Sequence, residues 1–245
     1  MNETGAGSGA WAIEVEGLGK SFGNHRALTG ICLKVGRGEH VTVFGPNGAG
    51  KTTLIKVLST LMKPSAGTVR LDGSDINKAP TEVRRKIGLV AHQTFLYDDL
   101  TVYENLKFYG KMYDVPNLEE QIRDVVRWVR LEARLHDRVG TLSRGMQQRI
   151  SIARAVIHNP SIVLLDEPEV GLDPHAIVMV REVLDSLSAG ERTVVMTTHN
   201  LEQGIEMSDR VVILDKGRIV YQEHKDRIDI ATFRETYDRY TESTK

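Results

Sequence analysis

The sequence predicts an α/β fold in which strand-forming segments are interrupted by an inserted helical lobe. Three observations predict this fold. A short apolar strand, a glycine-rich turn and a helix follow one another over residues 40–61. A helical pattern occupies residues 101 to about 158, within a lobe inserted near residues 94–158, and strand patterns resume at residue 162. A chain of 245 residues can bury a full core as one large domain, or as one domain with an inserted lobe.

The glycine-rich turn has the composition and the setting of a phosphate-binding loop. The run before it, residues 40–44, is apolar and β-branched like a buried strand. Its glycines let the backbone approach an anion, on which the loop N–H groups and the helix N-terminus converge. Lys51 is expected to reach the β- and γ-phosphates of a nucleoside triphosphate, and the Thr52 hydroxyl to ligate Mg²⁺. The predicted nucleotide-binding residues are Gly45, Pro46, Asn47, Gly48, Ala49, Gly50, Lys51, Thr52 and Thr53.

Composition argues against several classes of protein. Charged residues make up 27% of the chain and the net charge is -1, so no basic excess predicts binding to nucleic acid. A membrane-spanning helix needs about 18 consecutive apolar residues, and no stretch of the chain comes near that length, so we expect no direct membrane insertion. Residues 1–10 are rich in Gly and Ser and lack the apolar run of a signal peptide, and residues 1–11 are expected to form a disordered leader.

Cys32 is the one cysteine of the chain, which excludes an intrachain disulfide and fits a reducing compartment. Because it lies in the strand-like run 31–35 and no motif surrounds it, we expect a small, partly buried core residue. Residues 12–16 alternate between apolar and polar side chains, as an edge-exposed strand does. Further strands are expected at residues 67–73 and 87–91.

Three helices are predicted within the inserted lobe. Thr101 and Glu104 form a capping box at the start of the first helix, which Pro116 ends. Ser143 caps the third helix, which ends before Pro160. The middle helix is predicted from an apolar face formed by Ile122, Val125, Val126 and Val129.

After the lobe, the α/β pattern resumes. Strands are predicted at residues 162–166 and 193–197, and a hairpin turns at residues 215–217. Asp173-Pro174 opens a helix that runs towards Leu187, and Asn200 caps a short helix. The tail, residues 223–245, is expected to hold one polar helix between Arg227 and Tyr240.

Adjacent carboxylates follow the strand at residues 162–166, where ligands of an open parallel sheet gather. Asp166 and Glu167 point to opposite faces of a strand, so one can hold Mg²⁺ while the other orients the attacking water. His199, Gln93 and Phe22 are ambiguous on their own. Phe22 is either a core aromatic at a strand end or a flat platform for a purine ring, and the sequence alone favours the core.

Ser143 and Gly145 predict a second phosphate site. A serine that caps a helix, with glycine two residues later, presents a hydroxyl and free N–H donors at the positive helix end. Were the segment only a cap, Gly145 would be an odd choice in the first turn, because glycine lowers helix stability. A second anion site so far from the first suggests that it serves a neighbouring copy of the chain.

Together these motifs resemble the ATP-binding subunit of an ABC (ATP-binding cassette) transporter over roughly residues 12–222. Residues 45–53 match the Walker A loop and residues 162–166 match Walker B. Residues 142–147 match the family signature, and residues 171–173 match the D-loop.

The resemblance assigns roles to single residues. Phe22 matches the aromatic that stacks on adenine, and Gln93 matches the Q-loop glutamine, a Mg²⁺ contact and hinge to the helical lobe. Glu167 matches the catalytic glutamate, and His199 the switch histidine that contacts the γ-phosphate. The resemblance implies Lys51, Glu167 and His199 as catalytic residues, Thr52, Gln93 and Asp166 as Mg²⁺ contacts, and Ser143, Gly145 and Gln147 as further ATP-binding residues.

The resemblance also implies a P-loop NTPase (RecA-like) core with an antiparallel β subdomain and an inserted α-helical subdomain. Two copies are implied to close head to tail on ATP, which would lie between Lys51 of one copy and Ser143 of the other. A groove near Gln93 is implied to receive a cytoplasmic helix of an integral membrane permease. That partner would hold the chain at the cytoplasmic face of the cell membrane.

The transported substrate is less well indicated. Residues 92–106 and 143–146 resemble the ATPase of the haem exporter used in cytochrome c maturation, although the latter run also occurs in drug and lipid exporter ATPases. Soluble ABC ATPases of iron–sulfur assembly form an alternative of another class, with a different signature region. The chain departs from the commonest family pattern at Arg144, Met146 and Glu169; Arg144 could add a charge-assisted contact, although orientation towards solvent is favoured, and Glu169 has no explanation in the sequence.

Overall fold

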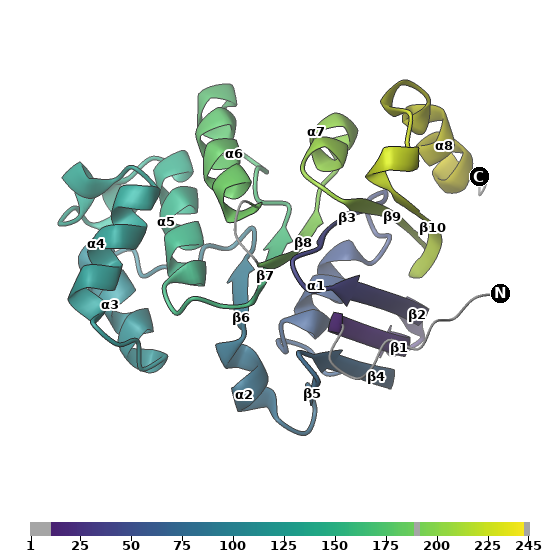
Figure 1. Ribbon diagram of the computed structural model, residues 1–245, viewed down its shortest axis with the longest axis horizontal. Helices are drawn as coiled ribbons and strands as arrows, with labels where there is room; N and C mark the ends of the chain where they lie inside the picture. The colour runs from purple at the N-terminus through teal and green to yellow at the C-terminus, as the bar shows by residue number, and fades with distance from the viewer. Residues whose placement is uncertain (1–10, 189–191, 243–245) are drawn as a thin grey trace.

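The chain forms two β-sheets, which the computed structural model shows lying against each other with a helix between them (Figure 1). The structure describes residues 11–188 and 192–242. One sheet has four strands in the order β2-β1-β4-β5, and the other has six in the order β10-β9-β3-β8-β7-β6. The strands are β1 (Trp11–Phe22), β2 (His25–Gly36), β3 (His40–Phe44), β4 (Ala66–Leu71), β5 (Ser74–Asp75), β6 (Ile87–Val90), β7 (Ile162–Asp166), β8 (Thr193–Thr197), β9 (Arg210–Asp215) and β10 (Arg218–His224).

The six-stranded sheet brings together the segments that carry the motifs. Strands β9, β3, β8, β7 and β6 are parallel, and β10 is an antiparallel edge strand. Strands β3 and β7 are buried at every position, as the continuous apolar runs predicted. Since parallel strands end at one edge, the loops after β3, β6, β7 and β8 gather there.

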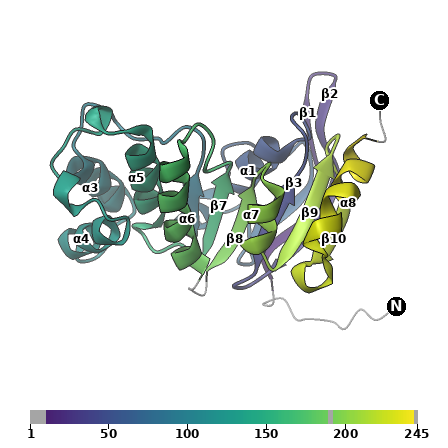
Figure 2. The same cartoon turned by 90° about the horizontal axis from the view of Figure 1, so that it is seen from above.

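The helices divide into a lobe at one end of the molecule and a set that covers the six-stranded sheet (Figures 1 and 2). Helices α3, α4 and α5 form the lobe, α6 and α7 lie on one face of the sheet, and α1 packs on the other. The helices are α1 (Lys51–Leu58), α2 (Pro80–Arg85), α3 (Val102–Met112), α4 (Leu118–Trp128), α5 (Arg144–Val156), α6 (Pro174–Ser188), α7 (Leu201–Glu206) and α8 (Ile230–Glu242), with short 3-10 turns η1 (Glu132–Arg134), η2 (Val139–Thr141) and η3 (Lys225–Arg227).

Several helix ends follow the capping chemistry predicted from the sequence. Thr101 and Glu104 form the reciprocal capping box of α3. The Ser143 hydroxyl accepts the N–H of Met146 at 3.3 Å, and the Asn200 side chain caps α7 in the same way. The predicted α/β fold with its inserted helices and its antiparallel sheet is confirmed.

Two predictions about strands are wrong. β1 is not an edge strand, because it pairs with β2 on one side and β4 on the other. Alternating apolar and polar side chains indicate that one face of a strand is buried, but they do not indicate how many strands pair with it. Cys32 is exposed rather than partly buried, because in β2 its neighbours Ile31 and Leu33 take the core face.

The helix predicted in the C-terminal tail is present as α8, and one of its side chains is buried against the sheet. Phe233 of α8 is 2% exposed, and its ring centroid lies 5.6 Å from that of Phe44 in β3. β10 continues to His224, so the boundary expected at residue 222 falls within a strand. The expected leader, apart from Trp11, lies outside the described residues. Among the described helices, none combines the length and the apolar character needed to cross a membrane.

Candidate nucleotide site

The loop between β3 and α1 has the backbone geometry of an anion cradle. Gly45 and Gly50 have φ values of 155° and 106°, in the region that favours glycine. A Cβ at Gly45 would lie 2.2 Å from the Leu214 carbonyl oxygen, and one at Gly50 would lie 2.6 Å from that of Ala27. The tight turn and the neighbouring strands therefore both require glycine at these positions.

Lys51 points into this loop. Its side chain is only 6% exposed, and its Nζ donates to the Gly45 carbonyl oxygen at 2.7 Å. The same Nζ lies 3.5 Å from Glu167 Oε1, so the loop after β3 and the loop after β7 meet at this ammonium group.

Asp166 lies where Mg²⁺ was predicted. Its Oδ1 accepts hydrogen bonds from the Thr52 hydroxyl at 3.2 Å and the buried Thr197 hydroxyl at 2.7 Å. Hydroxyl and carboxylate oxygens are the hard ligands that Mg²⁺ prefers, and Mg²⁺ commonly takes its remaining ligands from water and substrate phosphates. In the described part of the chain, no group of three or more His, Cys, Asp and Glu side chains could hold a metal ion. The Thr52 hydroxyl and the Asp166 carboxylate fit a Mg²⁺ ion that is bound together with a nucleotide, because both supply hard oxygen ligands at one place.

Glu167 departs from the strand in an uncommon backbone conformation. Its φ is 47°, and its N–H is held by the carbonyl oxygen and the hydroxyl of Thr197, at 3.0 and 3.1 Å. The turn directs its side chain towards Lys51 and brings Oε2 to 4.0 Å from Nδ1 of His199. His199 is 70% exposed, and it follows β8 as predicted.

Two hollows meet at Glu167. The first, called here the nucleotide hollow, is lined by Phe22, His25, Ala27, residues 46–53 and Glu167. The second, called the signature hollow, is lined by residues 92–96, Asp98, Leu142, Arg144, Gln147, Gln148, Glu167 and Val170.

Phe22 faces solvent rather than the core. Its side chain is 48% exposed on the rim of the nucleotide hollow, and the Lys20 ammonium lies 5.2 Å from its ring centroid. The preference for a core position drawn from the sequence alone is therefore wrong. An exposed flat ring beside the loop has the geometry of a platform for a base.

The signature segment lies apart from the nucleotide hollow of its own chain. Ser143 is exposed at the N-terminus of α5 and lines neither hollow. Gln93 is exposed in the signature hollow, together with Gln147. The Gln147 amide donates to the carbonyl oxygens of Val139 and Leu142, at 3.0 and 3.3 Å, so this amide holds the loop before α5.

Gly145 has a reason to be glycine that the sequence did not reveal. A Cβ at this position would lie 2.5 Å from the Cβ of Ala176 in α6. Close packing of α5 on α6 therefore accounts for the residue, and the choice of glycine is not in itself an argument for an anion site.

Three features of the site were missed or left open by the sequence. Thr197 holds both Asp166 and Glu167, and only its place two residues before His199 hinted at a role. The Arg144 side chain is exposed, yet its Nη2 lies 3.4 Å from Nε2 of His92, and its guanidinium lies against Gly171. Glu169 contacts Arg181 in α6 and Gln203 in α7.

The fold and the loop define a P-loop protein that binds a nucleoside triphosphate. The family model described as ABC transporter matches residues 28–170. The chain therefore belongs to the ATP-binding proteins of ABC transporters, and it is an ATPase.

Two curated relatives illustrate the similarity. The chain is 35% identical over 210 residues to the linearmycin resistance ATP-binding protein LnrL of Bacillus subtilis, covering 85% of this chain and 68% of the relative. It is 36% identical over 221 residues to the Nod factor export ATP-binding protein I of Ralstonia nicotianae, covering 89% of this chain and 69% of the relative.

Solved structures share the fold. A dimeric ATP-binding cassette in a post-hydrolysis state, bound to ADP and Pi, is similar with a TM-score of 0.79 and 28% identity, over 87% of this chain and 98% of that one. The cbiO1 subunit of the cbiONQ transporter complex from Clostridium perfringens is similar with a TM-score of 0.80 and 25% identity, over 93% and 92% of the two chains.

Proposed function

We propose that the chain is the ATP-hydrolysing subunit of an exporter, and that two copies close head to tail on ATP. The observation that carries the proposal is the separation of Ser143 from the nucleotide hollow. Lys51 and Glu167 lie in that hollow, whereas Ser143, at the exposed and positive end of α5, does not line it. A second copy can present its own Ser143 to the open side of the hollow.

Within each site the residues have distinct tasks. Phe22 stacks on the base, the loop N–H groups and Lys51 bind the phosphates, and Thr52 and Asp166 hold Mg²⁺, with Gln93 completing the contacts as the copies close. Bound Mg²⁺ supplies charge neutralisation at the β- and γ-phosphates. Glu167 orients the attacking water and takes its proton, and His199 contacts the γ-phosphate. Hydrolysis then depends on closure, because the site is incomplete in one copy.

The names of the relatives favour export of a drug-like or lipid-like compound. One relative is named for resistance to linearmycin and another for export of Nod factor. These names do not support a haem exporter, so we propose the alternative drawn from the sequence, the ATPase of an ABC-2 type drug or lipid exporter.

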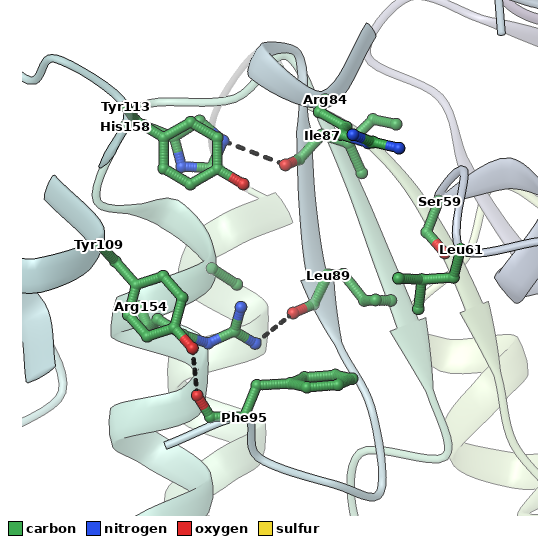
Figure 3. Close-up of a pocket in the computed structure, with 11 residues that line it drawn as sticks. Ser59, Leu61, Arg84, Ile87, Leu89, Phe95, Tyr109, Tyr113, Arg154 and His158 are labelled. Carbon is green, nitrogen blue, oxygen red and sulfur yellow. Dashed lines mark hydrogen bonds between the residues drawn. The ribbon is translucent and has the colours of Figure 1, made fainter. Parts of the chain in front are cut away.

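The membrane permease is proposed to bind a groove between α3, α5, β6 and the end of α1 (Figure 3). Its lining is mostly apolar and aromatic, and Leu61 on its rim is 57% exposed. Phe95 lines both this groove and the signature hollow, so the groove begins two residues from Gln93. The residues that line this docking groove are Ser59, Leu61, Arg84, Ile87, Leu89, Phe95, Tyr109, Tyr113, Arg154, Ala155 and His158.

The chemistry of the groove suits an amphipathic helix with an acidic side chain. The Arg154 guanidinium lies 5.5 Å from the Phe95 ring centroid and 5.4 Å from that of Tyr109, and it donates to the Leu89 carbonyl oxygen at 2.6 Å. Its Nε has no hydrogen-bond partner among the described atoms, and burial lowers the pKa of this arginine. A carboxylate from the partner would compensate the positive charge of the Arg154 guanidinium.

Copurification tests the partner. Leu61→Asp places a charge on the apolar rim and should remove most of the permease that copurifies with the tagged chain. Tyr240→Asp on the distant α8 makes the same kind of change at an exposed aromatic residue and should leave the copurified amount unchanged. A parent chain that copurifies with a soluble scaffold, and with no multi-span membrane protein, would contradict the exporter assignment.

A further inference from the structure

Three polar side chains form a cluster behind the candidate site. Nε of Arg181 lies 3.4 Å from Oε1 of Glu169, and Nη2 of Arg181 donates to Oε1 of Gln203 at 2.9 Å. The Gln203 amide nitrogen donates to the same carboxylate oxygen of Glu169, which closes the triangle. Gln203 is 3% exposed and the Glu169 side chain is 14% exposed, so these two members of the cluster are shielded from water, while the Arg181 side chain is 36% exposed.

The cluster joins three elements that otherwise meet the site separately. Glu169 lies in the loop after β7, two residues beyond Glu167. Gln203 lies in α7, four residues beyond His199, and Arg181 lies in α6. Backbone hydrogen bonds link Glu169 to the turn that carries Glu167. The Val170 N–H donates to the Glu167 carbonyl oxygen at 3.2 Å, and the Leu172 N–H donates to the Glu169 carbonyl oxygen at 3.2 Å. A shift of the Glu169 side chain would therefore move the turn that carries Glu167.

Glu169 does not face the nucleotide. It lines neither the nucleotide hollow nor the signature hollow, and its carboxylate is directed at Arg181 and Gln203. A carboxylate this poorly exposed is retained only when charge and hydrogen bonds compensate its desolvation, and such bonds to an ionised group are directional. The cluster therefore fixes geometry rather than supplying a reacting group.

We propose that Glu169 is a positioning residue for hydrolysis. Through Gln203 and Arg181 it holds the loop of Glu167 against the helix that follows His199, and so it keeps the two side chains at their 4.0 Å approach. This inference rests on the proposed roles of Glu167 and His199 in the reaction. Misplacement of catalytic groups by an ångström can lower the rate about a hundredfold. We therefore expect loss of the Glu169 contacts to lower kcat rather than to weaken ATP binding.

Steady-state kinetics of Glu169→Gln test the inference. The amide keeps the shape of the side chain and removes its charge. We expect kcat to fall by about tenfold to a hundredfold, while KM and the Kd of a fluorescent ATP analogue change less than about twofold. The matched control is Glu202→Gln, which makes the same change at an exposed residue next to Gln203 and should leave kcat at the parent value.

A transposed variant separates positioning from a merely structural role. Glu169→Gln combined with Gln203→Glu keeps one carboxylate, one amide and Arg181 in the cluster, so it should restore kcat to within about threefold of the parent. Melting temperatures measured on the same samples give the structural effect separately. The inference is overturned if Glu169→Gln keeps the parent kcat, if its loss appears only in KM, or if the transposed variant recovers the melting temperature without recovering kcat.

Glu167→Gln, assayed in parallel, distinguishes failure of this inference from failure of the proposed site. If Glu167→Gln turns over at the parent rate, the assignment of Glu167 fails and the inference fails with it. If Glu167→Gln is inactive while Glu169→Gln is fully active, only the positioning role of Glu169 fails.

Discussion

Lys51 and Glu167 define the candidate site at the scale of single residues. Backbone carbonyl groups help to hold each residue: the Lys51 Nζ donates to the Gly45 carbonyl oxygen, and the Glu167 N–H donates to the carbonyl oxygen and to the hydroxyl of Thr197. These hydrogen bonds to the backbone fix where each charged residue lies, in addition to the 3.5 Å ion pair between the two side chains. The consequences for nucleotide binding and for hydrolysis can therefore be tested one residue at a time.

Replacing Lys51 should affect binding itself. Lys51→Ala removes the ammonium group that lies inside the loop, and we expect binding of a fluorescent ATP analogue to be abolished. Lys56→Ala, an exposed lysine of the same helix, serves as the control and should bind the analogue like the parent. Analogue binding that survives Lys51→Ala would contradict the assignment of this loop.

Replacing Glu167 should separate binding from turnover. Glu167→Gln keeps the volume of the side chain but cannot accept a proton from water. We expect turnover to fall by roughly 10²–10⁴-fold while ATP binding is retained. Phosphate release and analogue binding, measured on one preparation, give the turnover rate and the affinity. A Glu167→Gln variant that hydrolyses ATP at the parent rate would show that Glu167 is not the catalytic base.

At the scale of elements, α8 is part of the folded core. Phe233→Ala removes a ring that packs on Phe44 and Tyr221, so the free energy of unfolding should fall by about 3–5 kcal/mol. Arg234→Ala, at the exposed neighbouring position of the same helix, should change it by less than about 0.5 kcal/mol. Urea unfolding measures both, and equal effects would show that α8 does not pack as described.

His158, which follows α5, should make the free energy of unfolding depend on pH. His158 stacks on Tyr113 with ring centroids 3.9 Å apart, and its Nε2 lies 3.0 Å from the Ile87 carbonyl oxygen (Figure 3). Burial lowers the pKa of His158 from 6.5 to about 4. Because the folded pKa is depressed, this histidine stabilises the fold fully above pH 6.5, and that contribution is lost as the pH falls to about 4.

The loss can be measured with a variant that does not titrate. His158→Phe keeps an aromatic ring beside Tyr113, so the free energy of unfolding should fall less between pH 7 and pH 4.5 than in the parent, by at most about 3 kcal/mol. His175→Gln, which replaces an exposed histidine on α6, serves as the control for the general effect of acid. A parent and a His158→Phe variant with the same pH dependence would contradict the burial of a neutral imidazole.

At the scale of the whole molecule, local signals predicted most of the fold. The capping box at Thr101 and the apolar run of β7 depend on residues close together in the chain, and both were predicted correctly. The phosphate-binding loop is also a local motif. The interior place of β1 and the burial of Phe233 depend on segments far apart in sequence, which periodicity does not report. For the same reason the partners of Glu169 became visible only in the folded chain.

If two copies enclose each ATP, two inactive variants should complement each other, and mixing them is the sharpest experiment on this arrangement. Lys51→Ala lacks the phosphate-binding lysine, whereas Ser143→Asp keeps a good helix cap and adds a charge that repels the γ-phosphate. The two variants mixed in equal amounts form one site with both native residues if Lys51 of one copy faces Ser143 of the other. We expect the mixture to hydrolyse ATP at a rate well above that of either variant alone. A mixture as inactive as its components would contradict the head-to-tail arrangement of the two copies.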